Sequence, residues 1–193
     1  MARDLEKHFS MKEKAFFETI KPFLEMNDAV LKIGNGFGYL STYIADYVAE
    51  LKILEINVFE KTINKEQVIL YDGKTLPVSD KSYDVAIFNL VFHHIPHNQD
   101  FLRQTIQKTR RYVILYEQTY DNIFQKINLV WRDWYINKKA GTPSRLYWNS
   151  YLRRKNVERF IEKLDVEIVH RTTKRSHMYF KELIVLEVQI PKS

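Results

Sequence analysis

Three of the five glycines in this 193-residue chain fall within five residues, at Gly34, Gly36 and Gly38. An apolar segment, residues 29–33, precedes them, and a helical pattern, residues 39–49, follows at once. Alternating glycines let the backbone turn sharply and let a ligand approach without Cβ atoms in the way. A helix that starts there offers free N–H groups at the carboxyl end of the strand. The pattern therefore predicts close backbone contact with a polar small molecule.

The second group with chemical potential is a histidine cluster, His93, His94 and His97. Beside a reacting centre, His93 or His94 could act as a general base. The alternative is that these residues cap or pack the element that follows the apolar segment 83–89. A metal site would need a fuller ligand set, and no carboxylate partner is evident beside the histidines. The sequence therefore gives two weak catalytic candidates and predicts no metal site.

The elements that must position these residues alternate between strands and helices, which predicts an α/β fold with a largely parallel sheet. Ser10 and Glu13 match a capping box at the start of a helix. Pro22 lies inside the pattern of that helix and should kink or shorten it. The last two strands have no helix between them, so they should pair as an antiparallel hairpin at one edge, connected by residues 171–182. We expect strands at 29–33, 51–58, 67–71, 83–89, 112–116, 166–170 and 183–188, and helices at 39–49, 98–110, 122–137 and 156–164.

Composition limits the possible functions. The chain has no cysteine, which excludes disulfide frameworks, thiolate zinc sites and cysteine nucleophiles. The N-terminus shows no secretory signal and apolar runs are too short to cross a bilayer, so we expect a cytoplasmic protein. The net charge is −4 over residues 1–100 and +10 over residues 101–193. The basic part favours an anionic partner or is simply a solvated surface.

Downstream motifs lead from these features to a family. The glycine loop is followed by YDGK at residues 71–74, by LPVSDKSYDVA at residues 76–86, and by His93 and His94. This order and spacing resembles the core of the class I S-adenosylmethionine (SAM)-dependent methyltransferases, particularly the branch that acts on small molecules and lipids. The resemblance covers residues 29–117. It implies a Rossmann-like domain with a seven-stranded, mostly parallel sheet and an antiparallel strand at one edge.

The resemblance also implies cofactor contacts. The glycine loop would surround the methionine part of SAM, Asn57 at the end of the second strand would meet the ribose hydroxyls, and Asp72 would accept from the adenine amino group. Asn89 and Leu90 would border the sulfonium. The implied cofactor-binding residues are Lys32, Gly34, Asn35, Gly36, Gly38, Asn57, Asp72, Gly73, Asn89 and Leu90.

Two positions depart from the family pattern. Lys32 stands where the family has an acid that balances the cofactor's ammonium, and Asn57 stands where it has a carboxylate. Lys32 either extends toward the cofactor carboxylate, or pairs with an acid such as Glu55 or Glu117, or marks a chain that has lost SAM binding and serves as a scaffold.

An aromatic segment, residues 119–151, contains all three tryptophans. In related methyltransferases this region builds a substrate lid, so Tyr120, Tyr147 and Trp148 are expected to contact the acceptor, whereas Trp131 and Trp134 should pack on the sheet. Beside Lys138, Lys139 and Arg145, such a lid suits a hydrophobic acceptor with an anionic group.

We therefore expect one domain over residues 1–193, with an N-terminal helical segment at 1–28. Its expected function is methyl transfer from SAM to a small-molecule or lipid-like acceptor. The alternatives are a non-catalytic binding or regulatory partner and, because of the basic run that begins at Arg153, an RNA methyltransferase.

Overall fold

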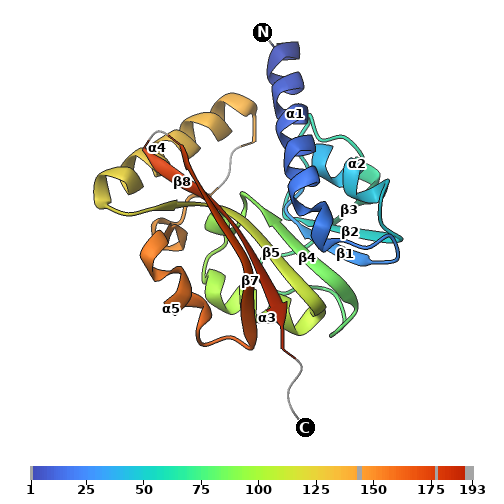
Figure 1. Cartoon of the computed structure of the whole chain (residues 1–193). Coiled ribbons are helices and arrows are strands. Elements are labelled where there is room, and N and C mark those ends of the chain that lie inside the picture. The colour runs from blue at the N-terminus through green and yellow to red at the C-terminus, as the bar shows by residue number, and fades with distance from the viewer. Residues whose placement is uncertain (1, 143–144, 177, 190–193) are drawn as a thin grey trace.

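The protein is described by a computed structural model that covers residues 2–142, 145–176 and 178–189. Seven strands form one sheet in the order β3-β2-β1-β4-β5-β8-β7, and a short strand, β6, pairs with β5 (Figure 1). β8 is antiparallel to both β5 and β7, and the remaining pairs are parallel. The predicted Rossmann-like architecture is confirmed. The strands are β1 (Ala29–Ile33), β2 (Glu50–Glu55), β3 (Val68–Leu70), β4 (Tyr83–Asn89), β5 (Thr109–Tyr120), β6 (Leu152–Arg153), β7 (Val166–Ser176) and β8 (Tyr179–Val188).

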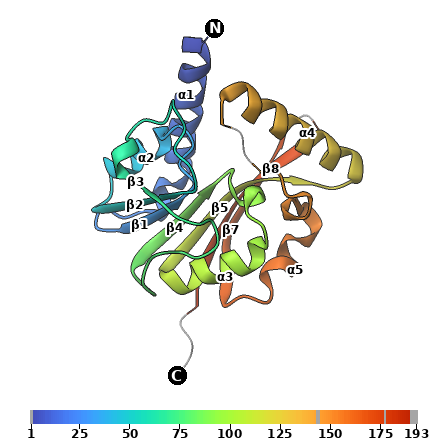
Figure 2. The ribbon, with the colours of Figure 1, turned by 180° about the vertical axis from the view of Figure 1, so that it is seen from behind.

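Helices cover both faces of the sheet (Figures 1 and 2). The period of two along each strand sends neighbouring residues to opposite faces, so Val30 packs under one helical layer and Leu31 under the other. The first layer is α1 and α2, and the second is α3 and α5. The helices are α1 (Ala2–Ile20), α2 (Tyr39–Ala45), α3 (Asn98–Lys108), α4 (Ile123–Ala140) and α5 (Val157–Ile161), with short 3₁₀ turns η1 (Lys21–Phe23), η2 (Lys65–Gln67), η3 (Phe92–His94), η4 (Trp148–Ser150) and η5 (Arg154–Asn156).

The start of the first helix differs from the prediction. α1 begins at Ala2 and continues through Ser10, so the prediction that Ser10 and Glu13 form a capping box at a helix start is wrong. The Ser10 hydroxyl instead lies 3.3 Å from the hydroxyl of Tyr43 on α2. Pro22 acts as predicted, because α1 ends at Ile20 and a 3₁₀ turn carries the proline.

Several strand boundaries differ from the prediction, among them those of β5, which covers Thr109–Tyr120 rather than 112–116. β2 ends at Glu55 rather than at residue 58, so Asn57 does not end this strand as predicted. β7 and β8 are also longer than expected, so most of the predicted connection 171–182 is strand. The outer part of β7 is polar because it is an edge strand whose side chains face solvent, and such a segment carries little apolar signal. The helices at 39–49, 98–110 and 156–164 are each shorter than predicted.

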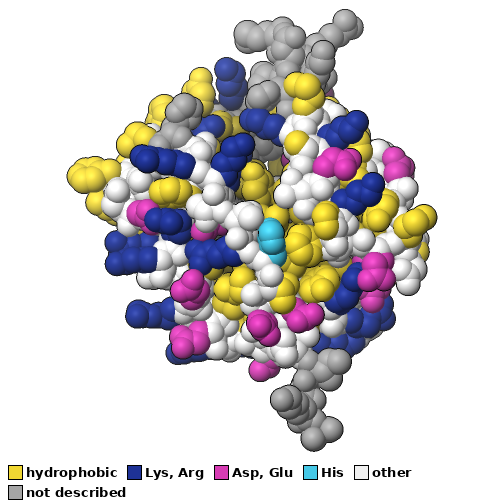
Figure 3. Space-filling model, in the orientation of Figure 1, with side chains coloured by type: hydrophobic (Ala, Val, Ile, Leu, Met, Phe, Trp, Pro, Cys, Tyr) yellow, Lys and Arg dark blue, Asp and Glu magenta, His cyan; other side chains and the backbone are white. Residues whose placement is uncertain are grey.

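α4 begins as predicted, because the Asn122 side chain accepts from the N–H of Gln125. The predicted packing of Trp131 and Trp134 on the sheet is wrong, because their exposed fractions are 59% and 46%. Hydrophobic side chains gather on the outer edge of the molecule over α4 (Figure 3). A helical period shows which residues share a face but not which face is covered. α4 is held through its other side, where Leu129 packs with Tyr151 and Tyr179.

Candidate active site

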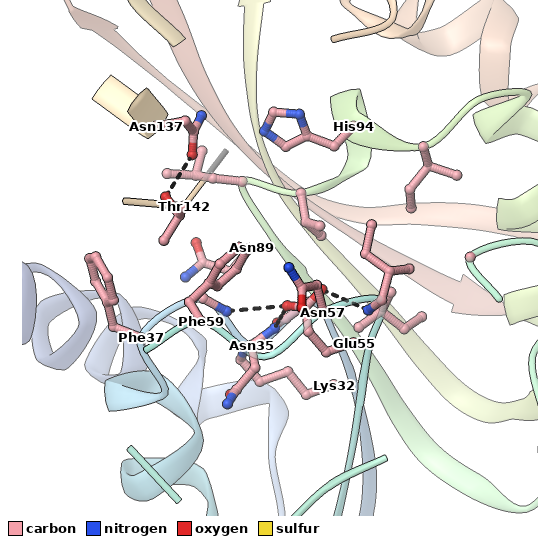
Figure 4. Close-up of a pocket in the computed structure, with 18 of the residues that line it drawn as sticks. Lys32, Asn35, Phe37, Glu55, Asn57, Phe59, Asn89, His94, Asn137 and Thr142 are labelled. Atoms are coloured by element: carbon pink, nitrogen blue, oxygen red, sulfur yellow. Dashed lines mark hydrogen bonds between the residues drawn. The ribbon is translucent and has the colours of Figure 1, made fainter. Parts of the chain in front are cut away.

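A cavity of about 600 Å³ opens at the carboxyl ends of β1, β2 and β4 (Figure 4). One side is made by the glycine loop 34–38, the segment after β2 and residues 71–74. The other side is made by residue 89 at the end of β4, by residues 90, 91 and 94–96 after it, and by the end of α4 with residues 142, 145 and 147. Phe9 and Glu13 of α1 close a third wall. This is the switch point at which doubly wound sheets bind their ligands.

The glycine loop has a conformation that only glycine adopts without strain. Gly34, Gly36 and Gly38 have φ of +76°, +55° and +90°. A Cβ on Gly34 would lie 2.6 Å from a Val91 methyl group, and one on Gly38 would lie 2.8 Å from the carbonyl oxygen of Ile63. A Cβ on Gly36 would meet no described atom within 4 Å. The loop therefore leaves an open backbone surface beside the cavity at Gly36.

Glu55, the last residue of β2, holds this loop in place. Its Oε2 accepts from the N–H of Asn35 at 2.6 Å and of Gly36 at 3.4 Å, and its Oε1 accepts from Ile56 N–H at 2.9 Å. The residue that ends the second strand is thus a carboxylate, and the placement of Asn57 at that position is wrong. Asn57 lies two residues further on and also lines the cavity. An error of three residues in the strand boundary hid Glu55.

Lys32 is buried directly beneath the loop, with 2% of its surface exposed. Its ammonium donates to the carbonyl oxygen of Gly34. Burial lowers the pKa of Lys32, while the carboxylates of Glu13 and Glu55 oppose that shift. Glu117 is not its partner, because it binds His93. Lys32 is therefore compensated by the protein's own carbonyl and carboxylates.

Glu13 of α1 is a cavity residue that sequence reasoning missed. The Asn89 amide donates to its Oε2 at 2.8 Å. Burial raises the pKa of Glu13, although Lys32, Asn89 and Lys181 act in the opposite direction. A signal was available: Glu13 lies one turn before the buried pair Phe16 and Phe17 on the helical face that α1 turns to the domain.

The remaining predicted cofactor residues also line the cavity. Asp72 is exposed, and its Oδ1 accepts from the N–H groups of Lys74 and Thr75, both at 2.8 Å. These two backbone hydrogen bonds lower the pKa of Asp72, and the bond from Thr75 contributes most. Both are made to Oδ1, so neither occupies Oδ2. Leu90 has a positive φ of +53°, a conformation that costs a non-glycine residue about 1–2 kcal/mol. Gly73, with φ of +73°, completes this wall.

The two histidine candidates occupy different environments. His93 is 1% exposed and outside the cavity lining, with Nδ1 at 2.6 Å from Oε1 of Glu117 and Nε2 at 3.3 Å from Oδ2 of Asp133. Burial lowers the pKa of His93, but Glu117 and Asp133 together outweigh it and raise the pKa to about 10. His94 lines the cavity, and burial followed by the charge of His93 lowers its pKa.

Both histidines have a carboxylate partner, so the premise for expecting no metal is wrong. His94 Nε2 lies 3.5 Å from Oδ2 of Asp133, and its Nδ1 lies 3.0 Å from the carbonyl oxygen of Arg145. Asp133 comes from α4, about forty residues later in the chain, and no local spacing could have paired it with the histidines. His97 is exposed and lies outside this cluster.

Of the three predicted lid residues, one lines the cavity and two do not. Tyr147 lines the cavity, together with Ile136 and Asn137 of α4. Tyr120 and Trp148 do not line it; they lie against the Lys126 ammonium, 5.1 Å and 4.4 Å from their ring centroids. Residues 143 and 144 of the predicted lid are outside the described residues.

Comparison with known proteins gives this architecture a family. The sequence model of a protein family described as 'Methyltransferase domain' matches residues 31–114, which extend from β1 into β5. This part of the chain is similar to a methyltransferase domain. The resemblance to the class I SAM-dependent methyltransferases is thereby confirmed, with SAM as the cofactor of that family. No curated protein sequence matches the chain.

Solved structures agree with the fold. A SAM-dependent methyltransferase from Methanosarcina mazei has a TM-score of 0.64 at 15% identity, covering 89% of this chain and 97% of its own. Magnesium protoporphyrin IX methyltransferase from Synechocystis, solved with bound S-adenosylhomocysteine (SAH), has a TM-score of 0.65 at 13% identity, covering 97% and 86%. The [4+2]-cyclase SpnF has a TM-score of 0.67 at 9% identity, covering 94% and 81%. The cyclase shows that this fold does not by itself fix the reaction.

Among the described residues, the structure contains no helix that combines the length and apolar character needed to cross a bilayer.

Proposed function

We propose that this protein transfers a methyl group from SAM to a small-molecule or lipid-like acceptor. The observation that carries the proposal is a single cavity with the glycine loop on one side and the end of α4, with Tyr147, on the other. When bound, SAM supplies a methyl group that is already activated by the sulfonium. The protein then has to hold an acceptor in line with that group in a site that excludes water.

The cofactor side is built for the polar parts of SAM. The open backbone at Gly36 suits the methionine part, and Glu55, with Asn57 beside it, offers acceptors to the ribose hydroxyls. The Oδ2 of Asp72, which neither Lys74 nor Thr75 occupies, can accept from the adenine amino group. Asn89, the last residue of β4, and Leu90 after it would border the sulfonium.

The cavity must accept the ammonium of SAM although the buried cation of Lys32 is close to the glycine loop. A cation beside a second buried cation is unfavourable. The Lys32 ammonium, however, donates to Gly34, while α1 brings the carboxylate of Glu13 to the same end of the cavity. We therefore assign to Glu13 the charge-balancing role that the family gives to an acid at the position of Lys32.

The acceptor side favours an apolar molecule that carries a negative group. Ile136 and Tyr147 offer apolar surface, and Arg145 offers a positive charge. The similar structure from Synechocystis is named for a large tetrapyrrole, which supports a cavity of this type for a bulky acceptor. RNA is less favoured because part of the basic surface is neutralised within the protein: Arg154 pairs with Asp121 at 2.7 Å.

Calorimetric titration with SAM tests the cofactor half of the proposal. We expect wild-type protein to bind SAM and Glu13→Gln to bind about tenfold or more weakly, since a charge-assisted contact is lost. Glu18→Gln, an exposed change on the same helix, is the matched control and should bind like wild type. If wild-type protein gives no heat at millimolar SAM, the protein is a non-catalytic scaffold.

Transfer of a labelled methyl group to candidate acceptors tests the other half. Amphipathic molecules with a carboxylate or phosphate should accept label in preference to RNA. If only RNA becomes labelled, the acceptor class proposed here is wrong while the cofactor assignment stands.

A further inference from the structure

Three potential metal-ligand atoms converge on the acceptor side of the cavity. They are Nε2 of His93 and Nε2 of His94, both from η3, and Oδ2 of Asp133 from α4. The carboxylate oxygen lies 3.3 Å from the first nitrogen and 3.5 Å from the second. The three residues together offer one ligand atom each within 4.8 Å of one another. His94 lines the cavity, so the cluster borders the space assigned to the acceptor.

Each ligand atom is oriented by a further contact. Nδ1 of His93 pairs with Glu117 at 2.6 Å, and Nδ1 of His94 pairs with the carbonyl oxygen of Arg145 at 3.0 Å. A carbonyl can only accept, so His94 carries its proton on Nδ1 and directs the lone pair of Nε2 at Asp133. Tyr151 donates to the same carboxylate oxygen at 2.7 Å. Histidines that ligate metals are held in this manner by carboxylates and backbone carbonyls.

A proton on His93 explains the cluster only in part. A protonated His93 would satisfy Glu117 and approach Asp133, yet its fully buried Nε2 is not aligned for a hydrogen bond with any described group. It would also leave the neutral His94 with a lone pair facing a carboxylate oxygen at 3.5 Å. A cation between the three atoms makes both contacts favourable.

We propose that His93, His94 and Asp133 bind a zinc ion. Zinc takes nitrogen and oxygen ligands at roughly 2.0–2.2 Å in a tetrahedron, which sets its ligands about 3.3–3.6 Å apart. Two of the three ligand separations in the cluster, 3.3 Å and 3.5 Å, match those edges. Magnesium prefers oxygen ligands in an octahedron with edges of about 2.9 Å, which fits neither the distances nor the imidazoles. Three protein ligands leave one position of the tetrahedron for a water molecule or an acceptor atom, and His94 connects the cluster to the cavity.

Zinc binding can be measured without SAM or acceptor, so its outcome is separate from that of the proposed function. Full-length protein treated with a chelator is titrated with zinc against a chromophoric competitor. We expect one zinc per chain, at least ~100-fold weaker binding in His94→Gln, and about 10- to 100-fold weaker binding in Glu117→Gln, which alters only the group that orients His93. His97→Asn, outside the cluster, should bind like wild type.

The titration overturns the proposal if wild-type protein takes up no zinc, or if His94→Gln retains the wild-type affinity. Circular dichroism of each variant shows whether it has folded. His93 and Glu117 are buried, so substitutions there can unfold the protein. The visible spectrum of wild-type protein with cobalt is therefore a further test, because it needs no variant. A strong tetrahedral band supports the site, and a weak octahedral spectrum contradicts it. Magnesium, used in place of zinc, should leave the melting temperature of wild-type protein unchanged.

Discussion

The two sides of the cavity are built in different ways. On the cofactor side, the glycine loop and Glu55 lie within 22 residues of each other, and backbone N–H groups make most of the contacts. On the acceptor side, His94, Asp133 and Tyr147 come from η3, α4 and the segment after it, and side chains make the contacts. The family match, residues 31–114, covers the first side except for Glu13 of α1, and only part of the second. Local spacing therefore encodes the cofactor side, whereas tertiary packing creates the acceptor side.

The largest combined effect on stability and SAM binding should come from the cofactor side, where Gly34→Ala places a Cβ against the Val91 methyl group at 2.6 Å in a residue with φ of +76°. The strained backbone and the overlap together should lower the free energy of unfolding by about 3 kcal/mol. Binding of SAM should be lost. Denaturant unfolding and calorimetry measure the two effects.

Gly141→Ala is the matched control for Gly34→Ala. Gly141 has nearly the same φ, +74°, but a Cβ there meets no described atom within 4 Å. Only the backbone strain remains, about 1 kcal/mol, and SAM affinity should stay at the wild-type value. Equal losses in the two variants would mean that the close approach of Val91 to the loop is not important.

Glu55→Gln should have the second largest effect. Glutamine keeps one acceptor where the carboxylate serves three N–H groups, so the loop loses charge-assisted hydrogen bonds worth about 1–3 kcal/mol. SAM affinity should fall by at least about tenfold. The exposed Glu60→Gln provides the control. If SAM affinity instead depends on Asn57 and not on Glu55, the strand boundary found here does not define the ribose contact.

Because of Glu13, we expect the free energy of unfolding and the affinity for SAM to change with pH in opposite directions. Its pKa in the folded protein is raised above 4.5. The unliganded protein should therefore become more stable with respect to this group as pH falls through the raised pKa, because the ionised form is the one disfavoured by burial. SAM affinity should decrease over the same range, by up to about tenfold, as the negative charge is lost. Calorimetry and thermal melting of wild type and Glu13→Gln check this, and both slopes should flatten in the variant.

Particular residues show how far the sequence reaches. β1 and β4 were predicted to the residue, because buried strands in a parallel sheet are mainly apolar runs with sharp ends, here with Lys32 inside β1 and Asp84 inside β4. The Glu55 assignment failed because an apolar pattern continues past the end of β2 into Val58. The partnership of Asp133 with His93 could not be predicted, since it depends on how α4 lies across η3. Local patterns carry no information on that crossing.

On the acceptor side, Tyr151→Phe removes the hydroxyl that donates to Asp133 at 2.7 Å. In metal-free protein this should cost about 1 kcal/mol of unfolding free energy, the usual value of one side-chain hydrogen bond. SAM affinity should not change, since Tyr151 does not line the cavity. Tyr135→Phe, at an exposed ring on α4, should leave both quantities unchanged. A loss of SAM affinity in Tyr151→Phe would show that the two sides are coupled.

The smallest effect should come from Trp131, although its helical spacing predicts a core residue. The ring is 59% exposed and stacks only on Tyr135 among the described aromatic side chains. Trp131→Gln should change the unfolding free energy by no more than about 0.5 kcal/mol. Leu129→Ala, two residues away at 0% exposure, should cost about 2–5 kcal/mol. If the tryptophan change proves the more costly of the two, then α4 turns its aromatic face to the domain, and the contacts assigned to Asp133 on the opposite face cannot form.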